Sequence, residues 1–152
     1  PGFKLKRSPA WNLVLRVGLL SVLKPRTLIP PLGEGVVTTR NQLHLDRAQE
    51  DEHWVTSFTA RFHVQTVLSI RKAWWELRKL KVPTLFLQAG EDHLVCPAES
   101  RRFFERIACP DKEFRLLDGL CHNLVAEPEM PDLAQSISDW MAARCRPRLS
   151  PA

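Results

Sequence analysis

Short apolar runs alternate with amphipathic segments through the second half of the chain, and this alternation restricts the fold more than any other feature. Residues 84–88 form an apolar run with the length and flanks of a buried parallel strand. A helix is predicted from Pro97, where the missing N–H of proline is harmless. A second strand is predicted over residues 113–117. A second helix is predicted from Pro131, with a stripe that faces the core, formed by Leu133, Ala134, Ile137, Trp140 and Met141. This β–α–β–α order predicts an α/β fold with parallel strands and right-handed crossover helices.

The first half of the chain lacks any clear strand pattern and is predicted to be mostly helical. An apolar helix is expected over Trp11–Leu23, followed by a Pro- and Gly-rich irregular segment over residues 24–35 and, further on, a long helical pattern. We therefore expect a helical cap or lid at residues 1–80, an α/β core segment at residues 81–146 and a tail at residues 147–152.

Two parallel strands are fewer than a stable open sheet normally contains. The chain also begins with Pro1 rather than Met, so we expect further strands of the same sheet to lie upstream of this sequence. Without those strands, the chain is expected to expose a sheet edge and apolar surface, and therefore to aggregate.

Composition and charge exclude several classes of protein. A hydrophobic fraction of 44% is enough for a buried core. There are 22 basic and 17 acidic residues, a net charge of +5, and the densest basic stretch, residues 71–81, is interleaved with Trp and Leu. This pattern is typical of an amphipathic helix rather than of a phosphate-binding stripe, so no nucleic-acid partner is expected. The apolar residues 11–23 are too few for the ~20 that a membrane span requires.

Cysteines and most histidines show no spacing that indicates a metal site. No two of the four cysteines are closer than twelve positions, so there is no Cys-x-x-Cys pair. We expect four inert thiols and neither a metal nor a cofactor. The histidines that we expect to be surface or cap residues are His44, His53, His63 and His93.

Two residues suited to acid–base chemistry follow the two predicted strands. Asp92 lies just beyond the first strand, and His122 lies just beyond the second. Reactive residues of open parallel sheets collect in the loops beyond the carboxyl ends of the strands. The order of acid before base is also the order found in α/β-hydrolases. We therefore predict that Asp92 and His122 form the acid–base pair of a serine hydrolase.

The sequence around this pair resembles a known family. Residues 80–95 and 119–127 are similar to the C-terminal block of the monoacylglycerol lipase and lysophospholipase-like family, which belongs to the α/β-hydrolases and is often grouped with serine aminopeptidases. Residues 8–78 resemble the helical cap of that family. Two positions depart from the family pattern, Cys96, where an acidic residue is common, and Asn123, where Glu is frequent. They affect the expected substrate preference but not the acid–base pair.

The resemblance implies acyl transfer through a Ser-His-Asp triad, with no cofactor. A serine attacks the ester carbonyl, His122 takes its proton and returns it to the leaving alcohol, and Asp92 fixes the imidazole tautomer. The serine should lie in a Gly-x-Ser-x-Gly turn, which this sequence does not contain. We therefore expect the nucleophile upstream of Pro1, and we expect this chain alone to be inactive.

Other interpretations of these residues remain open. Asp92 alone could be a turn residue, and His122 alone could be structural. Cys121 could be read as a thiol nucleophile, although adjacent residues on one loop rarely form a nucleophile–base pair. Glu127 is expected to support the histidine loop through backbone hydrogen bonds. The alternative function is a noncatalytic remnant or binding module with the same fold.

The sequence thus predicts a hydrolase of carboxylic esters that acts on a small acyl ester or lipid. Because no signal peptide is visible and the cysteines are unpaired, we expect a cytoplasmic protein. The apolar stripe from Leu13 to Leu23 raises the hypothesis of a lid that contacts a membrane surface. The sequence does not predict an oligomeric state.

Overall fold

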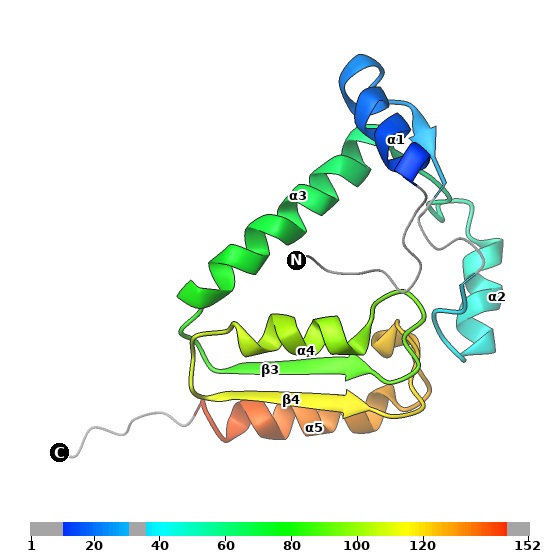
Figure 1. Cartoon of the computed structure of the whole chain (residues 1–152). Helices are drawn as coiled ribbons and strands as arrows, with labels where there is room; N and C mark the ends of the chain where they lie inside the picture. The colour runs from blue at the N-terminus through cyan, green and yellow to red at the C-terminus, as the bar shows by residue number, and fades with distance from the viewer. Residues whose placement is uncertain (1–10, 31–35, 146–152) are drawn as a thin grey trace.

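The computed structural model describes residues 11–30 and 36–145. The predicted tail at residues 147–152 lies outside the described residues. Figure 1 shows an α/β unit and a helical part, whose long diagonal helix, α3, runs down to the α/β unit. No helix within the described ranges is long and apolar enough to cross a membrane.

The helical part consists of three helices, α1 (Trp11–Leu23), α2 (Gln42–Glu50) and α3 (Ala60–Glu76). Helix α1 packs against α3. Thr59 caps α3 because its hydroxyl accepts a hydrogen bond from the Phe62 N–H at 3.1 Å, which satisfies one free donor of the first turn. A single 3-10 turn, η1 (Leu77–Lys79), follows α3.

The helical part also contains two short strands that the sequence analysis did not predict. Strand β1 (Leu28–Ile29) pairs antiparallel with β2 (Phe58–Thr59). The expectation of a mostly helical first half without a clear strand therefore missed this short pair. Two residues are too few to show the alternation by which a strand is recognised in a sequence.

The α/β unit follows the predicted β–α–β–α order. It comprises β3 (Thr84–Ala89), α4 (Pro97–Glu105), β4 (Lys112–Leu117) and α5 (Met130–Ala142), with a 3-10 turn η2 (Leu124–Ala126) before α5. The two strands are parallel, and their register pairs Thr84 with Lys112 and Ala89 with Leu117. The predicted parallel α/β arrangement is confirmed.

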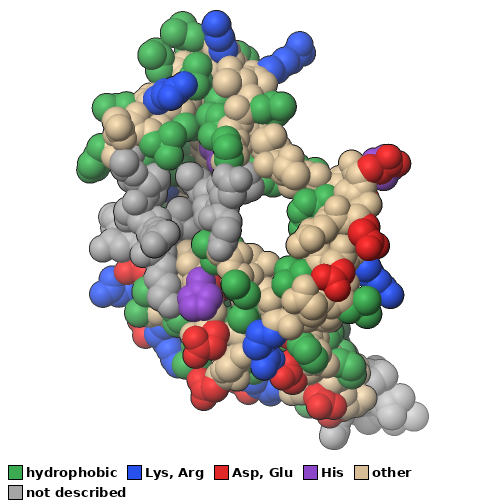
Figure 2. Space-filling model, turned by 90° about the vertical axis from the view of Figure 1, so that its right-hand side faces the viewer, with side chains coloured by type: hydrophobic (Ala, Val, Ile, Leu, Met, Phe, Trp, Pro, Cys, Tyr) green, Lys and Arg blue, Asp and Glu red, His purple; other side chains and the backbone are tan. Residues whose placement is uncertain are grey.

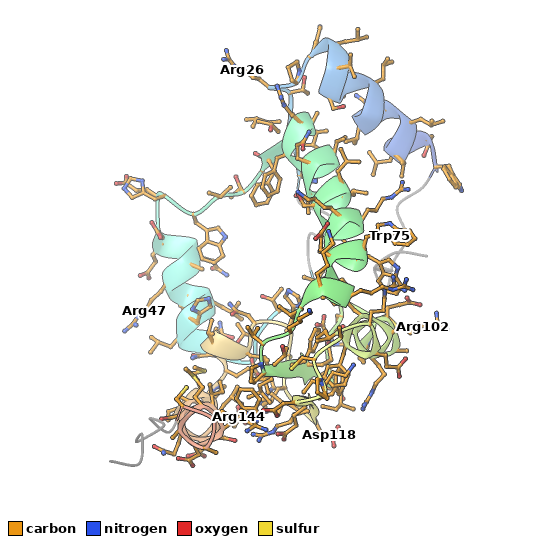
Figure 3. The ribbon with its side chains drawn as sticks, turned by 90° about the vertical axis from the view of Figure 1, so that its left-hand side faces the viewer. Arg26, Arg47, Trp75, Arg102, Asp118 and Arg144 are labelled. Carbon is orange, nitrogen blue, oxygen red and sulfur yellow. The ribbon has the colours of Figure 1, made fainter. Side chains whose placement is uncertain are left out.

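Helices α4 and α5 cover opposite faces of the two strands, as Figures 1 and 3 show. On the α4 face, the rings of Phe86 and Phe114 stack with centroids 5.5 Å apart, and Phe104 of α4 contacts Phe114 edge-on at 5.4 Å. On the α5 face, Trp140 Nε1 donates to Glu113 Oε2 at 2.8 Å. Neighbouring residues on a strand point to opposite faces, which explains why Glu113 and Phe114 contact different helices.

The apolar stripe of α5 is less buried than its periodicity predicts. Leu133 is buried, and Ile137 and Trp140 are half-buried, but Ala134 and Met141 are exposed. The prediction that all five face the core was wrong. Two strands are too narrow to cover the full width of a helix face.

The end of α3 makes one of the connections between the helical part and the α/β unit. Arg106 donates from Nε to the Trp74 carbonyl at 3.0 Å, and its guanidinium lies 4.5 Å from the centre of the Trp74 ring. Residues 38–41 make a second connection, to the segment around His122 and Glu127, and Figure 2 shows an opening between the two connections. Helix α2 stands apart from α3 on the other side of this opening (Figure 3).

The aromatic cluster against α4 is predicted to dominate the stability of the α/β unit. Phe104→Ala removes a ring that is 9% exposed and should lower the free energy of unfolding by about 3 kcal/mol. Phe62→Ala, at a ring that is half exposed, should cost less than about 1 kcal/mol. Urea denaturation followed by tryptophan fluorescence measures both. Equal losses for the two variants would contradict this assignment of the core.

Candidate active site

Asp92 lies in the turn that follows β3 and is 3% exposed. Its Oδ1 accepts hydrogen bonds from the backbone N–H groups of Leu94, at 2.9 Å, and Val95, at 2.8 Å. Its Oδ2 accepts from Gln88 Nε2 at 3.1 Å and lies 2.9 Å from His122 Nδ1. Both carboxylate oxygens are therefore held by donors.

The balance of burial and hydrogen bonding keeps Asp92 ionised. Burial alone would raise the pKa of Asp92. The hydrogen bonds from Val95, His122 and Leu94 outweigh burial, and the net effect is a lowered pKa. Asp92 is consequently a carboxylate at neutral pH and can only accept hydrogen bonds.

His122 lies in the loop after β4, and glycines allow this loop to approach the Asp92 turn. Gly119 has a φ of +74°, which L side chains rarely adopt. Gly90 N–H donates to the Leu117 carbonyl at 2.8 Å. A Cβ at Gly90 would lie 3.1 Å from both the Leu117 carbonyl oxygen and the Asp118 Cα. Glycine at position 90 therefore permits the close contact between the two loops.

The contact with Asp92 fixes the tautomer of His122. Since an ionised carboxylate accepts only, the Nδ1 atom of His122 carries the proton in the contact with Asp92 Oδ2. In the neutral imidazole, the lone pair is then on Nε2. The His122 side chain is 38% exposed, whereas that of Asp92 is 4% exposed. The arrangement therefore presents a half-exposed imidazole whose ring is oriented by a buried carboxylate.

A pocket with a volume of about 360 Å³ lies beside His122. His44 and Trp54 contribute to its wall, and their rings meet edge-on with centroids 6.1 Å apart. None of the described residues that line it is Lys, Arg, Asp or Glu. The full lining comprises Thr38, His44, Leu45, Ala48, Trp54, His122 and Asn123.

A larger cavity, of about 640 Å³, lies at the base of α1 and is less suited to acid–base chemistry. Its described lining comprises Lys24, Pro25, Arg26, Thr27, Thr59 and Arg61, with neither a carboxylate nor a histidine. We therefore identify the pocket beside His122 as the candidate active site.

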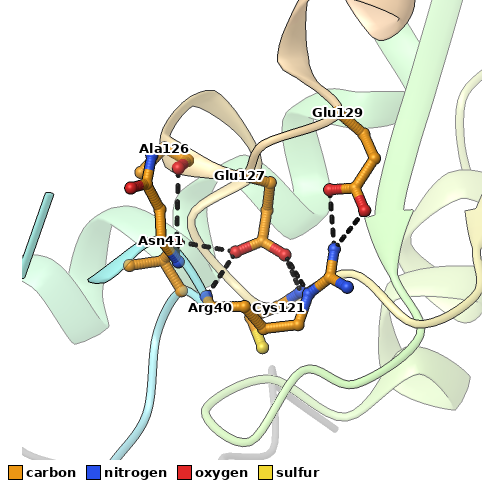
Figure 4. Close-up of polar contacts among 7 residues, drawn as sticks. Arg40, Asn41, Cys121, Ala126, Glu127 and Glu129 are labelled. Atoms are coloured by element: carbon orange, nitrogen blue, oxygen red, sulfur yellow. Dashed lines mark hydrogen bonds and ion pairs between the residues drawn. The ribbon is translucent and has the colours of Figure 1, made fainter. Parts of the chain in front are cut away.

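Glu127 is the second buried carboxylate near the site, and Figure 4 shows its contacts. It accepts hydrogen bonds from the Thr39 hydroxyl at 2.7 Å, from the Arg40 N–H and Nε at 2.8 Å each, and from the Cys121 N–H at 3.2 Å. The expected support of the histidine loop is thus confirmed by the bond from Cys121. Burial raises the pKa of Glu127, but hydrogen bonds led by that from Thr39 lower it to about 2.

Cys121 is poorly suited to act as a nucleophile. The residue is 4% exposed. Burial raises the pKa of its thiol, and the negative charge of Glu127 raises it further. Because the thiolate is the nucleophilic form, these surroundings favour a structural thiol.

The structure brings together the two residues that the sequence singled out, and it adds others that the sequence analysis missed. His44 was expected to be a surface or cap residue, but it lines the pocket beside His122. Thr39 and Arg40 were not singled out, although the polar run that precedes the helix cap at Asn41 is a signal that could have drawn attention to them. No cluster of three His, Cys, Asp or Glu residues that could hold a metal occurs within the described residues. All four cysteines are unpaired, and Cys145 is exposed.

Comparisons with known proteins extend over nearly the whole chain. The model of the serine aminopeptidase S33 family matches residues 1–129. Phospholipase YtpA of Bacillus subtilis is 29% identical over 133 residues, which are 87% of this chain and 51% of that protein. The chain therefore spans about half the length of this relative.

Solved structures show the same fold. The structure of a monoacylglycerol lipase from Paleococcus ferrophilus matches with a TM-score of 0.82 and 20% identity, over 94% of this chain and 56% of that chain. A soluble variant of monoglyceride lipase from Saccharomyces cerevisiae, in complex with a substrate analogue, matches with a TM-score of 0.73 and 17% identity, over 88% and 49% of the two chains. At these identities the likeness establishes the α/β-hydrolase fold alone.

The lowered pKa of Glu127 predicts a pH-dependent contribution to stability. Glu127→Gln should reduce the free energy of unfolding by about 2 kcal/mol near neutral pH, because a buried charged acceptor loses its charge. The pKa of Glu127 is about 2 in the folded protein and 4.5 in the unfolded chain. Ionised Glu127 therefore stabilises the folded state at pH values above 4.5, and this stabilisation is lost as the pH falls toward 2. The difference between wild type and variant should therefore shrink between about pH 5 and pH 3.

Urea denaturation over a series of pH values measures this difference. Glu129→Gln is the matched control, because Glu129 also pairs with Arg40 but its side chain is 46% exposed. It should leave the free energy of unfolding nearly unchanged, because an exposed ion pair contributes little to stability. A difference between wild type and Glu127→Gln that stays constant with pH would contradict the pairing of an ionised Glu127.

Proposed function

Because the chain belongs to the serine aminopeptidase S33 family of α/β-hydrolases, we propose that it supplies the acid, Asp92, and the base, His122, of a Ser-His-Asp triad that hydrolyses carboxylic esters. The main support is the 2.9 Å contact between His122 Nδ1 and an oxygen of the buried Asp92 carboxylate. This contact leaves Nε2 to accept a proton from a nucleophile.

The proposed reaction is acyl transfer in two steps. His122 Nε2 removes the proton of a serine hydroxyl as the serine oxygen bonds to the ester carbonyl carbon. The resulting imidazolium then protonates the leaving alcohol, and Asp92 stabilises its positive charge. Water attacks the acyl-enzyme in the second step, with His122 again as the base. The acid is released and the serine regains its proton.

We place the serine N-terminal to Pro1. The 152-residue sequence contains no Gly-x-Ser-x-Gly turn, and the chain spans about half the length of the relatives that it matches. Asp92 and His122 follow neighbouring parallel strands, and a serine after another strand of the same sheet would reach the same edge.

The proposed substrate is an acyl ester of the monoacylglycerol or lysophospholipid class, and the pocket favours the uncharged monoacylglycerol of the two. A phospholipase and two monoglyceride lipases are among the proteins that this chain resembles. The pocket beside His122 carries hydroxyl, amide, imidazole and indole groups but no described Lys, Arg, Asp or Glu. Such a lining suits an uncharged, hydroxylated leaving group better than an anionic one, which would be expected to recruit Arg or Lys.

Substitution of the acid or the base tests the proposal. In a version of the protein extended upstream to include the serine, Asp92→Asn and His122→Ala should each lower kcat for a monoacylglycerol by about 10⁴-fold. His93→Ala is the control, because His93 is exposed and follows Asp92 directly. It should retain activity within about threefold. The 152-residue chain alone should not react with a fluorophosphonate probe. Full turnover by either triad variant would refute the assignment.

We further propose that α1 contacts a lipid surface, which is where acyl esters of this class are found. Several of its apolar side chains are exposed, including Leu15, at 69%, and Leu19, at 61%. The basic residues Arg16, Lys24 and Arg26 are also exposed, residues 11–30 include no Asp or Glu, and Figure 3 shows Arg26 at the outer end of the molecule. An apolar helix with basic neighbours fits the interface of an anionic membrane.

Vesicle binding tests the role of α1. The double variant Leu15→Asp and Leu19→Asp should bind vesicles of phosphatidylcholine and phosphatidylglycerol at least about tenfold more weakly than wild type, because two leucines lose their burial in lipid. Leu43→Asp is the control, since Leu43 is 58% exposed but lies on α2. Co-sedimentation measures the binding. The proposal for α1 fails if the double variant and Leu43→Asp weaken vesicle binding equally.

A further inference from the structure

Residues 38–41, which connect to α2, cross the histidine loop and are bound to it at several points. We call these residues the strap. The Asn123 N–H donates to the carbonyl of Thr38 at 2.8 Å. Thr39 and Arg40 donate to the carboxylate of Glu127 (Figure 4). The strap and the histidine loop are far apart in the sequence, so these bonds hold two otherwise independent segments together.

The contacts converge on the backbone on both sides of His122. Cys121, directly before it, donates its N–H to Glu127 Oε2 at 3.2 Å. Asn123, directly after it, donates its N–H to the strap. The His122 side chain forms a hydrogen bond with Asp92. The position of its backbone is therefore set by Glu127 and the strap, and the position of its ring is set by Asp92.

The strap also determines where one wall of the pocket lies. Asn41, its last residue, caps α2 because its side chain accepts a hydrogen bond from the His44 N–H at 3.2 Å. The Asn41 N–H donates to the Thr39 hydroxyl at 3.1 Å, and that hydroxyl is bound to Glu127. A continuous chain of hydrogen bonds thus runs from Glu127 to the start of α2, which carries His44.

The choice of a carboxylate for this role has a physical reason. A buried ionic network is not in general more stable than a well-packed apolar one. It does, however, fix the relative orientation of the groups that it joins, because each donor must point at a lone pair of the acceptor. The two oxygens of Glu127 receive four donors, three from the strap and one from the histidine loop. Glu127 therefore fixes the geometry of both segments relative to each other.

We propose that Glu127 is a positioning residue that, through the strap, holds both His122 and the α2 wall of the pocket in register with Asp92. The proposal rests on the proposed function, because His122 must be the base for its position to matter in catalysis. Glu127 itself makes no contact with the reacting atoms in this proposal.

The hydrogen bond between His122 and Asp92 provides a direct measurement. Its Nδ1–H proton should give a far-downfield NMR resonance in the 152-residue protein labelled with ¹⁵N-histidine. Glu127→Gln and Thr39→Val should each broaden this resonance beyond detection or shift it upfield. They should also speed hydrogen exchange of the Asn123 amide at least about tenfold. Glu129→Gln, which alters the exposed partner of Arg40, should change neither measurement.

The two substitutions distinguish positioning from general destabilisation. Thr39→Val removes one donor to Glu127 but keeps the Arg40–Glu127 ion pair, so it should disturb folding less. If Glu127→Gln does not fold, Thr39→Val alone tests the positioning role of Glu127. A folded Thr39→Val protein with an unchanged resonance and unchanged Asn123 exchange would overturn the positioning role of Glu127, and the proposed function would stand. Absence of the downfield resonance from wild type would instead count against the Asp92–His122 pair, and so against both proposals.

Discussion

The parallel pairing of β3 with β4 is the constraint on which the rest of the candidate site depends. Because the strands run in the same direction, with Ala89 opposite Leu117, both chains leave the sheet at the same edge. The two exit loops then meet through the Gly90 to Leu117 hydrogen bond, and a side chain at position 90 would obstruct this contact. An antiparallel pair would place Asp92 and His122 at opposite ends of the sheet. The strand direction, set by the α4 crossover, therefore determines that Asp92 and His122 can meet.

Two buried carboxylates stabilise this edge in different ways. Asp92 is held by backbone N–H groups of its own turn, so its position depends on local structure. Glu127 is held mainly by Thr39 and Arg40, almost ninety positions earlier, so its position depends on the path of the cap segment. In both cases burial opposes the charge and hydrogen bonds outweigh burial. One carboxylate thus orients the imidazole, and the other connects the imidazole loop to the pocket wall.

The sequence alone was enough to predict the α/β unit, because its signals are local. Apolar runs of strand length, Pro97 at a helix start and the glycine turns each act over a few residues, and the fold followed from their order. The strap could not be predicted in this way. Thr39 and Arg40 acquire their role only through Glu127, and no periodicity connects positions so far apart. His44 was likewise interpreted as a cap residue, because its sequence surroundings give no sign of His122.

The weak connection between the two parts of the molecule gives the strap its importance. The end of α3, where Arg106 binds Trp74, anchors the helical part at one side of the α/β unit, and an opening lies beside this anchor (Figure 2). Helix α2 lies across that opening from α3, so the anchor at Trp74 cannot fix its position. The hydrogen bonds of the strap supply a second anchor, at the edge where His122 lies. The pocket wall and the backbone of the histidine loop are therefore held by the same contacts.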